Sequence, residues 1–146
     1  MDELLKLLDQ KLKYIRHDII DNTIFIYAES EEIEVCCPYC GRLSKRVHSI
    51  YQRSFQDMPI QGKKVITVLN NRKMFCDNTN YSHTTFAQTY VFLPYKAKKT
   101  KRLTDAIYDI SLNCSSVSAS KILRSSFADV SKSTICNLLK KRSSNN

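Results

Sequence analysis

The sequence predicts an α+β fold, in which a small antiparallel β unit with an N-terminal helix is followed by a unit of three helices. Two patterns support this prediction. Up to about residue 93, β-branched and aromatic residues form short strand-like runs around a pair of cysteines. Beyond residue 102, apolar residues recur with the period of amphipathic helices. A composition of 42% hydrophobic and 25% charged residues is that of a globular chain.

The first 35 residues are expected to form a helix and a hairpin. Leucines concentrate on one broad helical face at the N-terminus, which predicts an amphipathic helix over residues 2–13. The β-branched runs "TIFIYAES" and "EEIEVCC", residues 23–30 and 31–37, meet at a polar Glu-Ser-Glu. They predict a hairpin that leads directly into the cysteines.

Two longer runs, residues 45–53 and 63–76, predict the strands of a β domain over residues 36–93. In the second run Val65, Thr67 and Leu69 fall on one face of a strand. Because this run ends at Cys76, the domain is expected to carry cysteines at its strand ends.

Charge is distributed unevenly along the chain. Residues 1–35 hold four Lys/Arg against nine Asp/Glu, a net charge of −5. Residues 36–93 hold eight against two, and residues 94–146 hold eleven against three, which gives +6 and +8. Such a basic surface favours nucleic acid as a partner, because Lys and Arg neutralise phosphates and release condensed counterions. Solubility alone is the alternative explanation.

Residues 94–102 carry five Lys/Arg in seven positions and are expected to form a basic linker or an arm that contacts phosphates. Residues 103–142 then predict three short helices, with a frayed tail at residues 143–146. Ser116 and Ser131 precede the second and third helices, and their hydroxyls are suited to cap the first turns.

No apolar run reaches the ~18 residues that a membrane span needs, and the N-terminus is acidic where a secretory signal would be basic. We therefore expect a cytoplasmic protein without a membrane partner. Thiols stay reduced there, so the six cysteines are interpreted as buried thiols or metal ligands.

The motif Cys37-Pro-Tyr-Cys40-Gly has the spacing of a zinc knuckle, in which two thiolates approach one tetrahedral ion. Gly41 permits the tight turn that the motif needs. Cys76 is the expected third ligand, because it ends a strand and precedes the turn-forming "DNTN".

The fourth ligand is left open by the sequence. His83 is placed first, since a short loop could return its imidazole to the cysteines. Cys36 comes second, because adjacent side chains on extended backbone point to opposite faces, and His48 is also considered. Water or no metal is the third choice; without a metal, the pair is interpreted as reduced thiols in an apolar core.

Aromatic residues near the cysteines permit two interpretations, a base-stacking surface or a small core. A unit of this size has few other large apolar groups, so the core is favoured. The residues concerned are Tyr39, Tyr51, Phe55, Phe75 and Phe86.

Taken together, residues 37–88 resemble the N-terminal zinc-binding domain of ISL-three family insertion-sequence transposases. The resemblance rests on the Cys-Pro-x-Cys-Gly start, "VHSIYQR", "DMPIQGKKV", the Arg-Lys-x-Phe-Cys strand and "HTTFAQ". Downstream, "KKTKRL" resembles the family's basic segment and "SASKILRSSFADVSKSTICNLLKK" its helix-turn-helix, so the resemblance covers about residues 33–142. A fourth cysteine usually stands in the family at the position of Tyr81.

The resemblance implies a zinc-ribbon-like β domain with one Zn²⁺ ion, a helix-turn-helix, double-stranded DNA as partner, and a bacterial, nucleoid-associated location. The family's enzymes continue into a ribonuclease H-like domain with an Asp-Asp-Glu triad, which these 146 residues lack. We therefore interpret the chain as the DNA-binding portion of a transposase, truncated or a fragment, that recognises terminal inverted repeats without catalytic activity by itself. A second copy or an intact transposase is the expected protein partner.

Two alternatives remain open. One is a free-standing regulator of transposition that binds the same DNA, and the other is a protein-binding zinc ribbon.

In the helix-turn-helix interpretation, the start of the third helix faces base edges in the major groove and the basic segment contacts phosphates. The alternative is a three-helix packing unit with a solvated polar face. The expected base-contacting residues are Lys132, Ser133, Thr134 and Asn137, and the expected phosphate-contacting residues are Lys96, Lys98, Lys99, Lys101 and Arg102.

Overall fold

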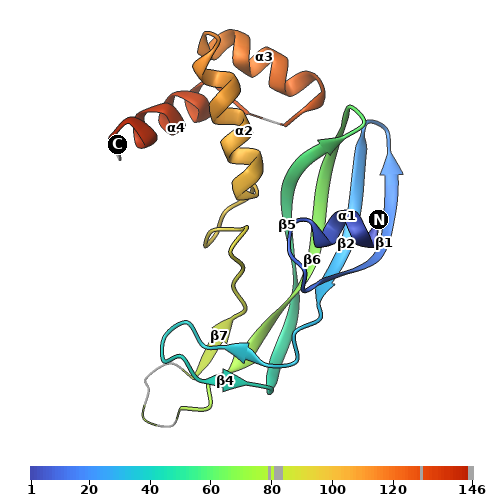
Figure 1. The fold of residues 1–146 in the computed structure, drawn as a ribbon, viewed down its shortest axis with the longest axis vertical. Coiled ribbons are helices and arrows are strands. Elements are labelled where there is room, and N and C mark those ends of the chain that lie inside the picture. Colours follow the sequence, from blue (N-terminus) through green and yellow to red (C-terminus); the bar gives the residue numbers. More distant parts are fainter. Residues whose placement is uncertain (79, 81–83, 129, 145–146) are drawn as a thin grey trace.

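The computed structural model describes residues 1–78, 80, 84–128 and 130–144, and it has the predicted α+β composition (Figure 1). Among these residues, five strands form a sheet in the order β1–β2–β6–β5, with β7 paired to the end of β6, and a small second sheet holds β3 and β4. The strands are β1 Leu12–Ile20, β2 Thr23–Ser30, β3 Val35–Cys36, β4 Leu43–Ser44, β5 Val47–Ile60, β6 Lys63–Phe75 and β7 Thr85–Ala87.

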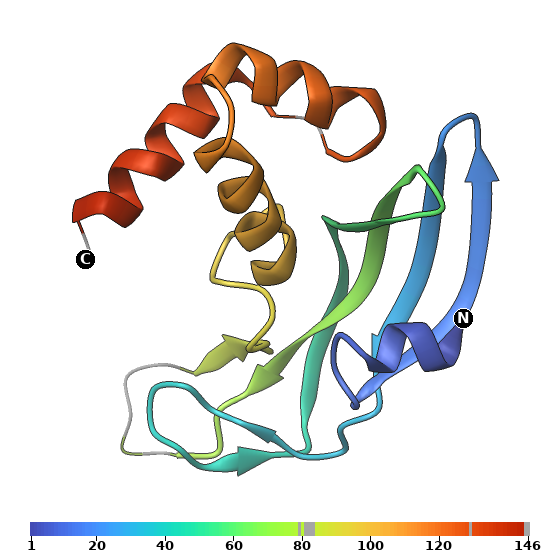
Figure 2. The ribbon, with the colours of Figure 1, turned by 45° about the horizontal axis from the view of Figure 1, so that its top comes forward.

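The prediction of a helix over residues 2–13 is wrong beyond its first turns. Helix α1 covers only Asp2–Lys6, and β1 begins at Leu12. Strand pairing with β2 satisfies the backbone of β1, and Leu12 is fully buried in the core of the sheet. α1 lies across the face of the sheet (Figure 2), where it buries Leu5.

The predicted hairpin between residues 23–30 and 31–37 is also wrong. β2 pairs with β1 and runs parallel to β6, so the sheet is mixed and not antiparallel as predicted. Of residues 31–37, only those of β3 form a strand, because three glutamates leave the rest little apolar surface to bury. The main sheet therefore joins strands from both sides of residue 35, where the sequence suggested a domain boundary.

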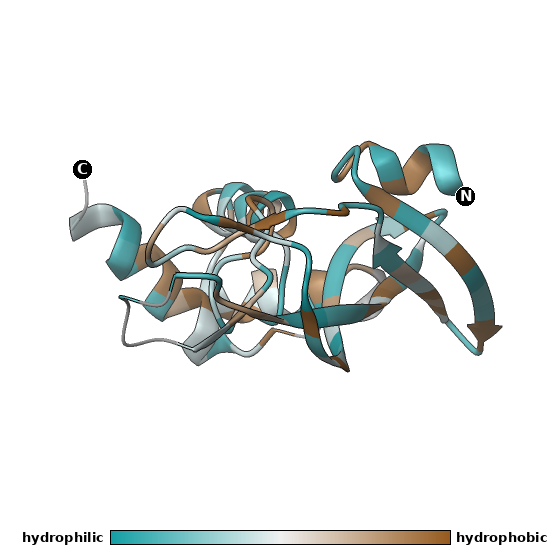
Figure 3. Cartoon of the chain, turned by 90° about the horizontal axis from the view of Figure 1, so that it is seen from below, coloured by the Kyte–Doolittle hydropathy of each residue, from teal (hydrophilic) through white to brown (hydrophobic). Residues whose placement is uncertain are grey.

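The two longest predicted strands are confirmed as the β5–β6 hairpin. Along β6, Val65, Thr67 and Leu69 are buried while the residues between them are partly exposed, and Figure 3 shows both hydrophilic and hydrophobic residues along the strands. The hairpin turns at Gln61 and Gly62, whose φ values of 51° and 74° suit a two-residue type I′ turn.

The three predicted helices are confirmed. They are α2 Lys101–Leu112, α3 Ser116–Ser126 and α4 Lys132–Ser144. Ser131 caps α4 by accepting a hydrogen bond from the Thr134 amide, as predicted, whereas α3 is capped by Ser115 and not by Ser116. In the described part of the chain, no helix combines the length and apolar character needed to cross a membrane.

Apolar residues of the three helices, with two residues between α3 and α4, form a core of their own. It consists of Leu103, Ile107, Ala119, Leu123, Ala128, Val130 and Ile135. Met58 of β5 packs against this core from the sheet, so the helical unit and the sheet are in direct contact.

The basic segment is attached to the sheet. The Gln56 amide donates to the Lys98 carbonyl over 2.8 Å, and the Thr100 amide donates to the Gln56 carbonyl over 2.9 Å. Residues 98–100 thus lie alongside β5, with Lys99 in parallel bridge to Gln56. Residues 94–102 are therefore not a free linker.

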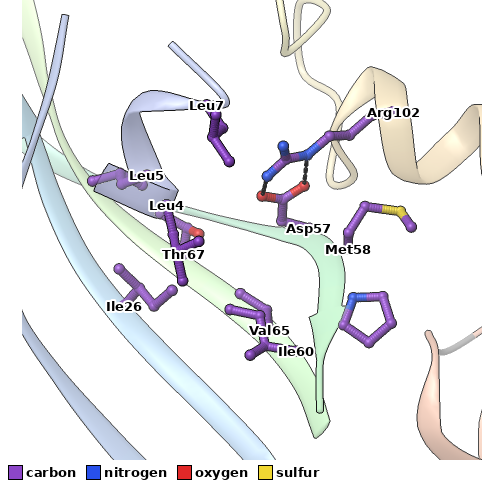
Figure 4. Close-up of a pocket in the computed structure, with 11 residues that line it drawn as sticks. Leu4, Leu5, Leu7, Ile26, Asp57, Met58, Ile60, Val65, Thr67 and Arg102 are labelled. Carbon is purple, nitrogen blue, oxygen red and sulfur yellow. Dashed lines mark hydrogen bonds and ion pairs between the residues drawn. The ribbon is translucent and has the colours of Figure 1, made fainter. Parts of the chain in front are cut away.

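An ion pair fixes the start of α2 on the sheet. The Thr100 hydroxyl accepts a hydrogen bond from the Leu103 amide and donates to the Asp57 carboxylate, while Arg102 donates to both carboxylate oxygens (Figure 4). Asp57 is buried, and this charge-assisted pairing satisfies it. Beside the pair, Leu4 lines a cavity of about 190 Å³ between α1 and the sheet.

Candidate metal centre

Three cysteines converge beside β4 and β7, which lie at the end of the molecule opposite α2, α3 and α4 (Figure 1). Cys37 and Cys40 lie between β3 and β4, and Cys76 directly follows β6. Their Sγ atoms all lie within 4.8 Å of one another, and the Sγ atoms of Cys40 and Cys76 are 3.4 Å apart. This separation exceeds the ~2.05 Å of a disulfide bond, so the thiols are free.

Backbone hydrogen bonds shape the loops that carry these thiols. Gly41 has a φ of 79°, a conformation that a glycine adopts without strain, and its amide donates to the Cys37 carbonyl over 2.9 Å. The Cys37 amide donates to the Arg42 carbonyl over 2.9 Å. The Cys76 amide donates to the Thr84 carbonyl over 2.8 Å, which brings the start of β7 back toward the cysteines.

The thiols differ in how readily they ionise. A backbone hydrogen bond from Arg42 is the main cause that lowers the pKa of the Cys40 thiol. At Cys76 a backbone hydrogen bond from Asn78 lowers the pKa, but desolvation and hydrogen bonds with Cys40 and Cys37 outweigh it, so the pKa is raised. Thiolates this close repel one another, and a bound cation would stabilise them together.

Apolar side chains close one side of the cysteine cluster. Cys37 is 1% exposed and packs with Val35, Met74 and Phe86. These residues come from β3, β6 and β7, so the cluster joins the small sheet to the end of the main sheet. Cys40 and Cys76 lie at its partly exposed edge.

The donor set fits zinc. In a tetrahedral site with Zn–S bonds of ~2.3 Å, neighbouring sulfur atoms lie ~3.8 Å apart. The 3.4 Å pair and the 4.8 Å limit bracket that value, so the spacing of the Cys37, Cys40 and Cys76 thiols permits them to bind one tetrahedral ion. The cluster is consistent with a zinc site in a zinc ribbon, with one position left for a fourth ligand.

Two of the candidates for the fourth ligand lie outside this cluster. Cys36, the last residue of β3, is exposed and is not one of the three clustered cysteines, and its Sγ donates to the Gly41 carbonyl over 3.3 Å. His48 packs its ring edge-on against Phe75, with ring centroids 5.0 Å apart. The preferred candidate, His83, lies outside the described residues, as does Tyr81.

Comparison with known families identifies the segment that carries this cluster. Residues 34–78 match the zinc-finger of transposase IS204/IS1001/IS1096/IS1165. The matched segment contains all three clustered cysteines, which confirms the resemblance to a zinc ribbon of ISL-three transposases over this part of the chain. No curated protein and no solved structure matches the chain.

The residues predicted to contact DNA lie on two surfaces. The predicted base-contacting residues are all exposed on the first two turns of α4, and they are Lys132, Ser133, Thr134 and Asn137. In the basic segment Lys96, Lys98 and Lys101 are exposed, while Lys99 is half-buried. Arg102 differs from these lysines, because its guanidinium is bound to Asp57.

The prediction that the aromatic residues form a core is right for some and wrong for others. Phe55 and Phe86 are buried, but Tyr39 and Tyr51 are 49% and 41% exposed. Tyr39 lies on the short zinc-knuckle loop, and residues 47–52 of β5 are exposed on both faces. The sequence gives no signal of this, since the apolar residues of "VHSIYQ" are those of an ordinary half-buried strand.

Proposed function

We propose that this chain is the DNA-binding portion of a transposase that recognises the terminal inverted repeats of an insertion element, with no catalytic role for its own residues. The observation that carries the proposal is the match of residues 34–78 to a transposase zinc finger, together with the convergence of three of its cysteines. The basic charge of residues 36–146 supports a DNA partner.

In this proposal one Zn²⁺ ion is held by Cys37, Cys40 and Cys76, with His83 as the fourth ligand. Four protein ligands would leave no open position on the ion, so its role would be structural, as a cross-link between the two cysteine loops. The four ligand residues would thereby hold β3, β4 and β7 in place at the end of β6.

Helices α3 and α4 supply the proposed duplex-binding surface. The connection between them is tied down, because the Ser120 hydroxyl and the Arg124 guanidinium both donate to the Val130 carbonyl, at 2.8 and 3.0 Å. α4 packs against both α2 and α3 and buries Ile135. A three-helix unit with a polar, exposed start of its last helix supports a helix-turn-helix that places α4 in the major groove.

The exposed residues of α4 have side chains suited to base edges. Asn137 could pair with an adenine and Lys132 with the acceptors of a guanine, while Ser133 and Thr134 could reach either bases or phosphates. We assign phosphate contacts to Lys96, Lys98, Lys99 and Lys101. Arg102 is left out of this assignment, because Asp57 neutralises its charge and fixes its position.

The test is binding of the full chain, loaded with zinc, to a duplex that carries the terminal inverted repeat of an ISL-three element. We expect the terminal-repeat duplex to bind more tightly than a scrambled duplex, with an affinity that falls steeply with salt. Asn137→Ala should cost about tenfold for the repeat and leave scrambled DNA almost unaffected.

Lys101→Ala should instead weaken both duplexes alike and reduce the salt slope by about one. Lys13→Ala is the matched control, since Lys13 is also exposed but lies on β1. Equal affinity for the repeat and the scrambled duplex would contradict sequence recognition. Salt-insensitive binding to a protein, with none to DNA, would favour the protein-binding zinc ribbon.

A further inference from the structure

A groove separate from α4 lies between the zinc-knuckle loop, the start of β5, β7 and the basic segment. Its volume is about 790 Å³, which is within the ~300–1,000 Å³ of sites for small ligands and far too small for a duplex. None of the described residues that line it is acidic. The lining residues that matter for its chemistry are Tyr39, Tyr51, Arg53, Tyr95, Lys96 and Lys98.

Tyr51 is held in a fixed position by a buried network under the groove. The side-chain amide of Asn71, which is fully buried, donates to the Tyr51 hydroxyl over 2.9 Å. The Tyr90 hydroxyl donates to the other end of that amide over 3.0 Å, and burial raises the pKa of Tyr90, so it remains a neutral donor. Tyr51 is 41% exposed, and its hydroxyl is held by Asn71, which reduces the entropy lost on binding.

Tyr95 is presented at the tip of a tight turn on the opposite wall. The Ala97 amide donates to the Pro94 carbonyl over 2.9 Å, and Lys96 has a φ of 59°, a conformation that is unfavourable for lysine. Arg53 holds the turn against β5 by donating to the carbonyls of Pro94 and Ala97, at 3.1 and 3.2 Å. Tyr95 is 80% exposed as a result.

Cations accompany these aromatic rings. The Lys96 ammonium lies 5.4 Å from the centroid of the Tyr95 ring, and Lys98 is exposed on the same segment. Exposed aromatic rings beside lysines suit single-stranded nucleic acid, because every base has a face that stacks and every nucleotide has a phosphate. A proline-rich peptide would use the rings but not the positive charge.

We propose that this groove binds unpaired nucleotides of single-stranded DNA, with bases stacked on Tyr39, Tyr51 and Tyr95 and phosphates near Lys96 and Lys98. The site is distinct from the proposed duplex-binding surface on α4 and does not depend on it. Lys96 and Lys98 are assigned to phosphates of both kinds of DNA, so the two proposals are distinguished by Tyr95 and Asn137 and not by these lysines.

The experiment measures binding of the full zinc-loaded chain to a fluorescent oligodeoxythymidylate of about ten nucleotides, a length typical of single-strand sites. Tyr95→Leu should weaken binding about tenfold, whereas Tyr95→Phe, which keeps the ring, should bind like the unaltered protein. Because Tyr95 is exposed at a turn, neither change should disturb the fold. Tyr39→Leu should have a similar effect, with zinc content measured to show that the adjacent site is intact.

Duplex binding separates this proposal from the proposed function. Tyr95→Leu should leave duplex affinity unchanged, and Asn137→Ala should leave single-strand affinity unchanged. The proposal is overturned if the oligonucleotide does not bind, or if it binds equally well to Tyr95→Leu, so that only lysine charge matters. Binding of a proline-rich peptide to the same tyrosines, without displacement of that peptide by the oligonucleotide, would overturn the proposal in favour of a peptide site.

Discussion

The two ends of the molecule are stabilised by different means. Among the described residues, the helical unit buries seven residues in its own core, and side-chain hydroxyls cap each of its three helices. The cysteine end buries four, one of which is Cys37 itself. Apolar burial contributes roughly 25 cal/mol per Å². A cluster this small therefore gains little stability without a cross-link. We therefore expect the cysteine end to depend on metal and the helical end on packing.

Loss of the metal should have the largest effect, and it should be confined to one end. Cys76→Ser is expected to abolish zinc binding, because structural zinc sites contribute on the order of 10 kcal/mol to folding in isolated zinc fingers. Elemental analysis gives zinc per chain, and NMR amide spectra report which residues lose order. The resonances of α2 to α4 should remain in place.

Zinc content also decides the fourth ligand. About one zinc per chain that is lost in His83→Ala would identify His83. A folded chain without zinc would contradict the metal site and favour reduced thiols in an apolar core. Cys36→Ser is the control, since Cys36 lies outside the cluster and its loss should leave the zinc bound.

A cavity in the helical core should produce the second largest effect, at the opposite end. Leu123 is fully buried, so Leu123→Ala should lower the free energy of unfolding by ~2–5 kcal/mol. Val117→Ala, on the same helix at a 46% exposed position, should have little effect. Chemical denaturation followed by helical circular dichroism measures both. Loss of zinc from Leu123→Ala would contradict the independent stabilisation of the two ends, because they would then fold as one unit.

The junction between the ends should contribute less. Asp57→Ala removes the carboxylate that Thr100 and Arg102 share, at a cost of ~1–3 kcal/mol, with the Arg102 part reduced because that side chain is 41% exposed. Asp105→Ala is the control, since its ion pair with Arg142 is more exposed and should be worth under ~1 kcal/mol. Thermal unfolding gives the stabilities. Small-angle scattering should show a wider range of orientations of the helical unit relative to the sheet in Asp57→Ala, but not in Asp105→Ala.

Removal of a single helix cap should have the smallest effect. Ser131→Ala leaves the Thr134 amide without its acceptor, which should cost about 1 kcal/mol. Ser143→Ala, in the last turn of the same helix, should be neutral. Denaturation curves measured in parallel distinguish the two. Equal stability of Ser131→Ala and the unaltered protein would show that water replaces the cap.

Local patterns predicted much of this fold correctly. The alternation of Val65, Thr67 and Leu69 located β6, and the 3.6-residue period after residue 102 located all three helices. The spacing of Cys37 and Cys40 located the knuckle, and Cys76 was chosen because it ends a strand. These features depend on residues close in the chain, whose geometry follows from backbone periodicity alone.

The prediction failed in which segments pair with one another to form the sheet. The leucines of residues 4–12 suit a helix, but pairing with β2 draws Leu12 into a strand, and β2 itself lies parallel to a strand forty residues away. The exposure of Tyr39 and Tyr51 was missed for a related reason, since burial depends on which elements cover a residue.

The class of the fold, the three C-terminal helices, the two long strands and three residues of the candidate metal site could be read from the amino-acid sequence. The mixed order of the sheet, the attachment of α2 through Asp57 and Arg102, and the groove beside Tyr95 arise only when the chain is folded. This is because periodicity and motif spacing act within a few residues of backbone. Strand pairing, ion pairs and grooves instead depend on the free energy of contacts between segments far apart in the chain.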